Sequence, residues 1–153
     1  MAVDPAALRQ IAAQLQAGVV LRLHSPIAEK PKRHVMIYAD ANRSLAFMIN
    51  TKPPPFIAKN TDRLARQVLM PQCLHKFMQH DSHITCDDVL GIACRKDGLT
   101  GSRQDLIQAV ADGRVEILGN LHRSLYGLVT TAADGSRHIA NRDAVLIAGA
   151  FKI

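Results

Sequence analysis

The chain has 153 residues, of which 48% are hydrophobic and 21% charged, so it is expected to fold as one globular domain and not to be disordered or collagen-like. Aromatic residues make up only 4% and Trp is absent, which predicts an aliphatic core and disfavours an RNA-binding sheet built on stacked aromatic rings. The formal net charge is +6, and residues 30–66 account for all of it, with eight Lys and Arg side chains against Asp40 and Asp62.

The sequence also bears on the compartment. It contains no run of about 18 apolar residues that would span a membrane, and Asp4 and Arg9 interrupt the region where a signal peptide would be apolar. The cysteines Cys73, Cys86 and Cys94 form no CxxC pair, which is typical of reduced thiols. We therefore expect a cytoplasmic protein with no membrane contact.

The first third of the chain predicts a helix, a strand and a hairpin. Asp4 and Pro5 are an N-cap and a first helical residue, and apolar positions at helical spacing predict a helix over 5–16. A strand is expected from Gly18 to His24. The next segments are expected to be an exposed cationic loop at 27–33 and hairpin strands at 34–39 and 44–50, after which Pro53–Pro55 end the pairing.

Residues 60–70 are ambiguous. Asn60 or Thr61 could cap a helix, whereas a strand over 66–70 is favoured before Pro71. A short helical turn at 75–79 and two strands, at 83–86 and 88–94, are expected next.

The last third of the chain gives weaker signals for secondary structure. Ser102 and Asp105 resemble a capping box and predict a helix over 103–112. Another helix is expected near 121–129, and the apolar segment 144–150 is of undefined type. Together these elements predict an α+β domain with a bent antiparallel sheet of five or six strands. Its predicted core comprises Val20, Leu21, Val35, Ile37, Phe47, Ile49, Val68, Ile84, Val89 and Ile92.

The densest polar cluster of the sequence lies between His75 and Cys86. His80, His83 and Cys86 could bind zinc, with Asp81 or His75 as a fourth ligand, but HxxHxxC is not a usual zinc spacing. A structural role is favoured, in which Asp81 and Ser82 cap backbone groups and Cys86 packs in the core. No metal is therefore predicted, and without a Walker A loop or GxGxxG no nucleotide cofactor is expected either.

A second polar combination lies around the hairpin. With its turn at 40–43, position 33 lies near position 50, so Arg33 and Thr51 could face one groove. A cation that stabilises a phosphorane and a hydroxyl that orients the attacking 2′-OH would suffice for metal-free RNA cleavage. The alternative, a solvated loop beside a threonine that flanks a turn, is favoured on sequence alone.

Several segments resemble a branch of the PemK/MazF-like proteins of bacterial toxin–antitoxin systems. The resemblance covers residues 18–94 and rests on KPKR (30–33), HVMIYADANRSLAFMINT (34–51), PPFI (54–57), QVLM (67–70) and FMQHDSHITC (77–86). Its most specific part is the string formed by His80, Asp81, Ser82, Ile84 and Cys86. The resemblance implies an SH3-like β-barrel with accessory helices, commonly dimeric, over 18–94 of a single domain 1–153, with 98–153 as a helical extension.

For toxin members, the resemblance implies a metal-independent endoribonuclease that an acidic antitoxin segment neutralises. The implied catalytic residues are Arg33, or else Lys32, and Thr51, although the toxin loop usually reads Gly-x-Arg-Pro and this chain has Pro31 before both cations. The residues expected to contact RNA are Lys30, Lys32, Arg43, Lys52, Lys59, Arg63 and Arg66. The alternative is a non-catalytic module of the same fold that binds an acidic protein partner or nucleic acid.

Overall fold

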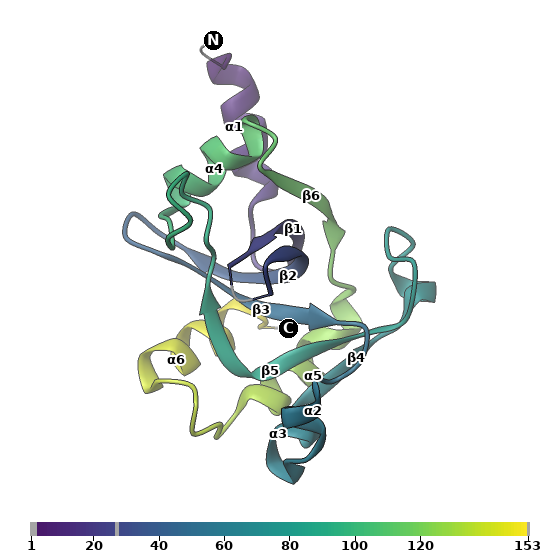
Figure 1. Ribbon diagram of the computed structural model, residues 1–153. Helices are drawn as coiled ribbons and strands as arrows, with labels where there is room; N and C mark the ends of the chain where they lie inside the picture. The colour runs from purple at the N-terminus through teal and green to yellow at the C-terminus, as the bar shows by residue number, and fades with distance from the viewer. Residues whose placement is uncertain (1–2, 27, 153) are drawn as a thin grey trace.

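The computed structural model describes residues 3–26 and 28–152 and shows an α+β fold built on one antiparallel sheet of six strands. The strand order is β4-β5-β3-β2-β1-β6, which leaves β4 and β6 at the two edges, so the sheet is not a closed barrel (Figure 1). The strands are β1 (Val19–Ser25), β2 (Lys30–Ala39), β3 (Ser44–Asn50), β4 (Gln67–Met70), β5 (Ser82–Gly91) and β6 (Val115–Asn120).

Helices cover both faces of the sheet. They are α1 (Pro5–Gln14), α2 (Pro55–Ala58), α3 (Thr61–Ala65), α4 (Arg103–Ala111), α5 (Tyr126–Ala133) and α6 (Asn141–Ala150), with single 3-10 turns η1 (Gln72–Leu74) and η2 (Arg123–Leu125). In Figure 1, α1 and α4 lie together at one end of the molecule and α5 and α6 at the other. Within residues 3–26 and 28–152, none of these helices has the length and apolar character needed to cross a bilayer.

Two apolar clusters follow from the alternation of side chains along the strands. Val20, Val35 and Phe47 lie opposite one another in β1, β2 and β3 and share a core with residues of α5 and α6. Leu21 and Met36 point to the other face and pack with residues of α1 and α4. The predicted core residues are buried, apart from Val89, which is partly buried.

The cationic segment before the hairpin is a strand, not the loop expected from its polarity. β2 begins at Lys30, and its first residues pair with β1 from Lys30 opposite Ser25 to Arg33 opposite Arg22. Pro31 lies at the second residue of the strand, before the pairing with β3 begins at Arg33, and proline occurs in strands at their start or along an unpaired edge. β1 ends at Ser25 and β2 begins at Lys30, and Ser25 Oγ accepts a hydrogen bond from the Ala28 amide at 3.2 Å. Residue 27 of the expected loop lies outside the described residues.

The strands expected at 83–86 and 88–94 form one strand, β5, with an irregularity in its middle, and this strand ends at Gly91, so the prediction of a strand over 92–94 is wrong. Thr85 pairs with Met48 and Leu90 with Ala46, so residues 86–89 of β5 stand opposite Phe47 alone. This bulge bends the strand and turns Asp87 out of the regular alternation. It also explains why the sequence reads as two strands.

The ambiguous segment 60–70 contains both alternatives in succession. Asn60 Oδ1 caps α3 by accepting from the Arg63 amide at 3.1 Å, and β4 begins at Gln67. The helix expected over 103–112 is α4, with the reciprocal Ser102 and Asp105 capping box. The segment 98–153 adds a strand as well as helices, because β6 pairs with β1 along the sheet edge.

Candidate nucleic-acid interface

The beginning of β2 and the end of β3 lie side by side at one end of the sheet. Arg33 pairs with Ile49, and Lys32 Nζ donates a hydrogen bond to Asn50 Oδ1 at 3.1 Å. Thr51 follows directly after β3 and is exposed. The register thus brings the cations of the KPKR segment close to Asn50 and Thr51, as the sequence predicts.

Lys32 and Arg33 project from opposite faces of the sheet, because neighbouring residues of a strand alternate. Arg33 lies on the same face as its partner Arg22 in β1 and is half-buried, and its Nε is buried without a hydrogen-bond partner. Like charges directly opposite each other repel. The nearest carboxylate contact is Glu116 Oε2, 3.9 Å from Arg22 Nη1, with both side chains largely exposed. This pair of guanidinium groups would be stabilised by an anion.

On the other face, Lys32 begins a chain of polar contacts that crosses four strands. Asn50 Nδ2 donates to Thr85 Oγ1 at 3.1 Å, and the Thr85 hydroxyl donates to Gln67 Oε1 at 2.9 Å. Gln67 Nε2 donates to the Arg63 carbonyl at 3.2 Å. Partial burial, with Lys30 as a secondary cause, lowers the pKa of Lys32. The chain holds the Lys32 ammonium in a defined place at the sheet end.

His83 stands next to Thr51. It pairs with Asn50 across β3 and β5, and its Nδ1–H donates to the Thr51 carbonyl at 3.3 Å. The sequence suggested His83 only as a possible metal ligand, because nothing local indicates that β5 runs beside the end of β3. This end of the sheet therefore carries a half-exposed imidazole, the Thr51 hydroxyl and two cations, Lys32 on one face and Arg33 on the other.

Three of the predicted RNA-binding cations are instead held by carboxylates. Arg43 pairs with Asp143 at 2.8 Å, Arg63 with Asp87, and Arg66 with Asp62 at 3.2 Å. Of the remaining cations, Lys30 and Lys52 are exposed at the sheet end, whereas Lys59 lies at the end of α2. We therefore leave Arg43, Arg63 and Arg66 out of the interface.

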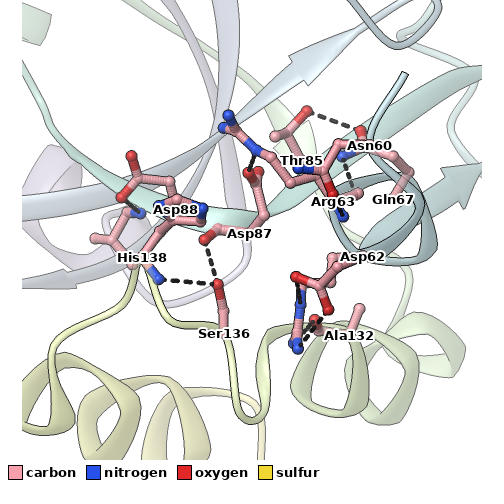
Figure 2. A network of polar contacts seen from close by, with 12 residues as sticks. Asn60, Asp62, Arg63, Gln67, Thr85, Asp87, Asp88, Ala132, Ser136 and His138 are labelled. Carbon is pink, nitrogen blue, oxygen red and sulfur yellow. Dashed lines mark hydrogen bonds and ion pairs between the residues drawn. The ribbon is translucent and has the colours of Figure 1, made fainter. Parts of the chain in front are cut away.

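The pairs of Arg63 and Arg66 belong to a network that joins α3, β5 and the segment after α5 (Figure 2). The Asp87 side chain is fully buried, and its backbone carbonyl accepts a hydrogen bond from Ser136 Oγ at 2.6 Å. Arg66 also donates to the carbonyls of Ala132 and Asp134, at 3.0 and 2.6 Å. These contacts connect segments far apart in sequence, so the network has a structural role.

The most specific string of the resemblance surrounds the start of β5. Asp81 Oδ1 accepts from the Gln72 amide at 2.8 Å, Ser82 is buried, and Cys86 is fully buried, which raises the pKa of its thiol. His80 is exposed. Over residues 3–26 and 28–152, no three His, Cys, Asp or Glu side chains gather as they would around a metal ion.

His75, the other ligand considered for a metal, is a fully buried core residue. Its Nδ1–H donates to the Pro71 carbonyl at 2.7 Å, while Nε2 accepts from the His122 amide at 2.9 Å. Both ring nitrogens are therefore used within the fold. Comparison of the chain with family models, curated proteins and solved structures found no match.

Proposed function

We propose that the protein binds single-stranded RNA across the end of the sheet where β2 begins and β3 ends, and cleaves it there without a metal ion. The observation that carries the proposal is the presence of Lys32 and Arg33, neither of them paired with a carboxylate within the described residues, beside Asn50 and Thr51. Lys30 and Lys52 extend this positive surface. The resemblance to PemK/MazF-like toxins agrees with this location.

The reaction would be an internal transfer. The 2′-OH attacks the adjacent phosphorus, the bond from phosphorus to O5′ breaks, and the leaving O5′ takes up a proton from water, so that a 2′,3′-cyclic phosphate and a 5′-OH are formed. In this scheme Arg33 stabilises the additional charge on the phosphorane, and the Thr51 hydroxyl orients the 2′-OH. His83, whose Nδ1 contacts the Thr51 carbonyl, has its other ring nitrogen left to accept the proton of the 2′-OH in this scheme.

A second candidate function is a non-catalytic module that binds an acidic protein segment or nucleic acid. The observation in its favour is that Lys32 and Arg33 point to opposite faces, and that no hydrogen bond joins Arg33 to Thr51 in the described part of the chain. An extended acidic segment could contact both cations by wrapping the end of the sheet. Such a ligand would need neither the hydroxyl of Thr51 nor a proton acceptor.

Single-turnover incubation with mixed-sequence RNA in EDTA separates the two functions. We expect the wild type to cleave in EDTA and Arg33→Ala and Thr51→Ala each to lose about 100-fold or more in rate, the usual effect of removing a charge-stabilising or proton-handling group. Arg123→Ala, at an exposed position in η2, is the matched control and should cleave like the wild type. Tight binding without cleavage would favour the module, and no binding of RNA at all would contradict both the ribonuclease and a module that binds nucleic acid.

A further inference from the structure

A cavity of about 270 Å³ lies on the Lys32 face of the sheet. Its floor is formed by β1, β2 and β3, and its wall by the end of β5 and the loop that follows. The residues that matter for its chemistry are Leu23, His34, Met48, Leu99 and Thr100. None of them takes part in the polar chain from Lys32 to Gln67 or in the network around Asp87, so the cavity is a separate feature.

His34 gives the cavity an unsatisfied polar group. The residue has a relative exposure of 5%, and its Nδ1 has no hydrogen-bond partner in the described part of the chain. A buried polar atom without a partner is costly, and in native proteins it often marks a place where a ligand or water binds. Burial lowers the pKa of His34 to about 4, so at pH 7 the ring is neutral and offers one donor and one acceptor.

The wall opposite His34 is well defined. A Cβ at Gly91 would lie 2.2 Å from Thr100 Oγ1, so the absence of a side chain there lets Thr100 pack directly on β5. The loop is closed by hydrogen bonds from Gly101 N to the Ile92 carbonyl, at 3.0 Å, and from Arg95 N to the Leu99 carbonyl, at 3.2 Å. Leu99 is 60% exposed at the rim. The cavity therefore has a hydroxyl on one side and an apolar rim.

The cavity lies beside the cationic surface. Lys32 is two residues before His34 on the same face of β2, a separation of about 6.6 Å along a strand, and it pairs with Leu23 of the cavity floor. Small-molecule sites usually measure about 300 to 1,000 Å³, so a cavity just below this range suits a single ring system better than a whole nucleotide. A ligand with a flat ring and an attached phosphate would fit the two features together.

We propose that this cavity receives one unstacked nucleobase of an RNA strand whose phosphate is held at Lys32. The base edge would meet His34 and Thr100, and its faces would contact Leu23 and the Met48 thioether, which packs favourably on aromatic rings. This inference rests on the proposed RNA binding and deepens it. The cationic end of the sheet holds the backbone, and the cavity selects the position of a base.

Fluorescence anisotropy with 5′-labelled hexanucleotides tests the proposal, with 2′-fluoro groups in place of the attacking 2′-OH so that the wild type cannot cleave the probe. The probes are oligo-U, oligo-A and oligo-C, each also prepared as a series with one abasic nucleotide moved through the six positions. For the wild type we expect the affinity to fall about tenfold when the abasic nucleotide stands at one position, and less than twofold elsewhere. We expect His34→Leu to abolish this dependence on position while leaving the salt dependence of binding unchanged.

Two further variants keep the test independent of folding. Thr100→Val removes a hydroxyl at the exposed rim with little change of shape and should reduce the penalty at the same position. His80→Leu replaces an exposed histidine outside the cavity and should behave as the wild type. The thermal midpoint of His34→Leu should stay level or rise, because a leucine has no unpartnered buried atom.

The outcomes distinguish this inference from the proposed function. Two results would overturn the base cavity alone. The first is salt-dependent binding of all probes with the same affinity at every abasic position. The second is a position-specific penalty that persists in both His34→Leu and Thr100→Val. Absence of binding by the wild type would overturn the proposed function and this inference with it.

Discussion

Two regions of the molecule draw their cations from the same basic stretch of sequence, yet they differ in what those cations contact. At the sheet end, the cations Lys30, Lys32 and Arg33 have no carboxylate within 4 Å in the described residues. In the network around the β5 bulge, by contrast, Arg63 and Arg66 each meet one (Figure 2). Only unpaired cations leave a field that a polyanion can use. The sheet end is therefore the region suited to binding a polyanion, whereas the network around the β5 bulge stabilises the fold.

The cause of the difference is the fold, not the composition. Asp87 comes within reach of Arg63 because the bulge in β5 turns it toward α3, and Asp62 in the first turn of α3 lies four residues before Arg66, which places the two side chains on one side of the helix. At the sheet end, the neighbours of Lys32 across the strands are Leu23 and Asn50, which carry no charge.

The largest effect is expected from Arg63→Met. This change leaves the fully buried Asp87 carboxylate without its guanidinium partner, and removing one member of a buried pair commonly costs about 3 to 5 kcal/mol. Because the Arg63 side chain is 22% exposed, we expect about 3 kcal/mol, measured as the loss in the free energy of unfolding in urea at pH 7.

Two matched variants complete that measurement. Arg63→Met combined with Asp87→Leu should recover most of the loss, since no uncompensated charge is then buried. Lys30→Met at the sheet end should change the free energy of unfolding by less than about 0.5 kcal/mol. Equal losses in Arg63→Met and Lys30→Met would contradict the division into two regions.

A similarly large loss in the free energy of unfolding is expected at acid pH, because of His34 in the cavity. His34 titrates at about 4 in the folded protein, because of its burial, and at about 6.5 when unfolded, so the unfolded state binds more protons between these values. The contribution of neutral His34 to the free energy of unfolding is fully present above pH 6.5. It is lost as the pH falls toward 4, by up to about 3 kcal/mol.

Urea unfolding of wild type and His34→Leu at pH 7.0 and 4.5 measures this contribution, because carboxylates that titrate in the same range affect both proteins. The wild type should lose about 2 to 3 kcal/mol more than the variant. Identical losses would show that His34 is already solvated in the folded state.

A smaller effect is expected from Asn50→Leu. This change removes the amide that connects Lys32 to Thr85, so the partly buried Thr85 hydroxyl loses a donor and Lys32 loses its acceptor. Because Lys32 can turn to water, we expect a loss of about 1 to 2 kcal/mol in the free energy of unfolding. If Asn50→Leu changes neither the free energy of unfolding nor the affinity for RNA, the polar chain does not hold Lys32 in place.

The elements that the sequence predicts correctly are those with strong local signals. The Asp4 cap with Pro5, the hairpin around Asp40–Arg43 and the capping box of Ser102 and Asp105 are each determined by a few neighbouring residues. The core residues follow from alternation along those strands. The proximity of Lys32 and Arg33 to Asn50 is a consequence of the hairpin register and is predictable for the same reason.

The remaining features depend on contacts between distant segments. β6 and β1 pair although they lie about a hundred residues apart in sequence, and the same separation applies to Arg43 and Asp143. No local sequence pattern therefore predicts either contact. For Lys30–Arg33 the polar side chains and Pro31 predict a loop, whereas the segment is a strand because it pairs with β1. His83 and the cavity around His34 could not be predicted without the strand order.

The measurement that tests the central claim most directly is the salt dependence of RNA binding. With Lys30, Lys32, Arg33 and Lys52 each neutralising about one phosphate, the logarithm of the affinity for a mixed-sequence single strand should fall with the logarithm of the salt concentration with a slope of about −3. Neutralising Lys30 and Lys32 together to Gln should reduce the slope by about 1.4, and neutralising the exposed Arg123 and Arg137 to Gln should leave it unchanged. Equal losses in the two double variants, or an affinity independent of salt, would contradict the assignment of RNA binding to this end of the sheet.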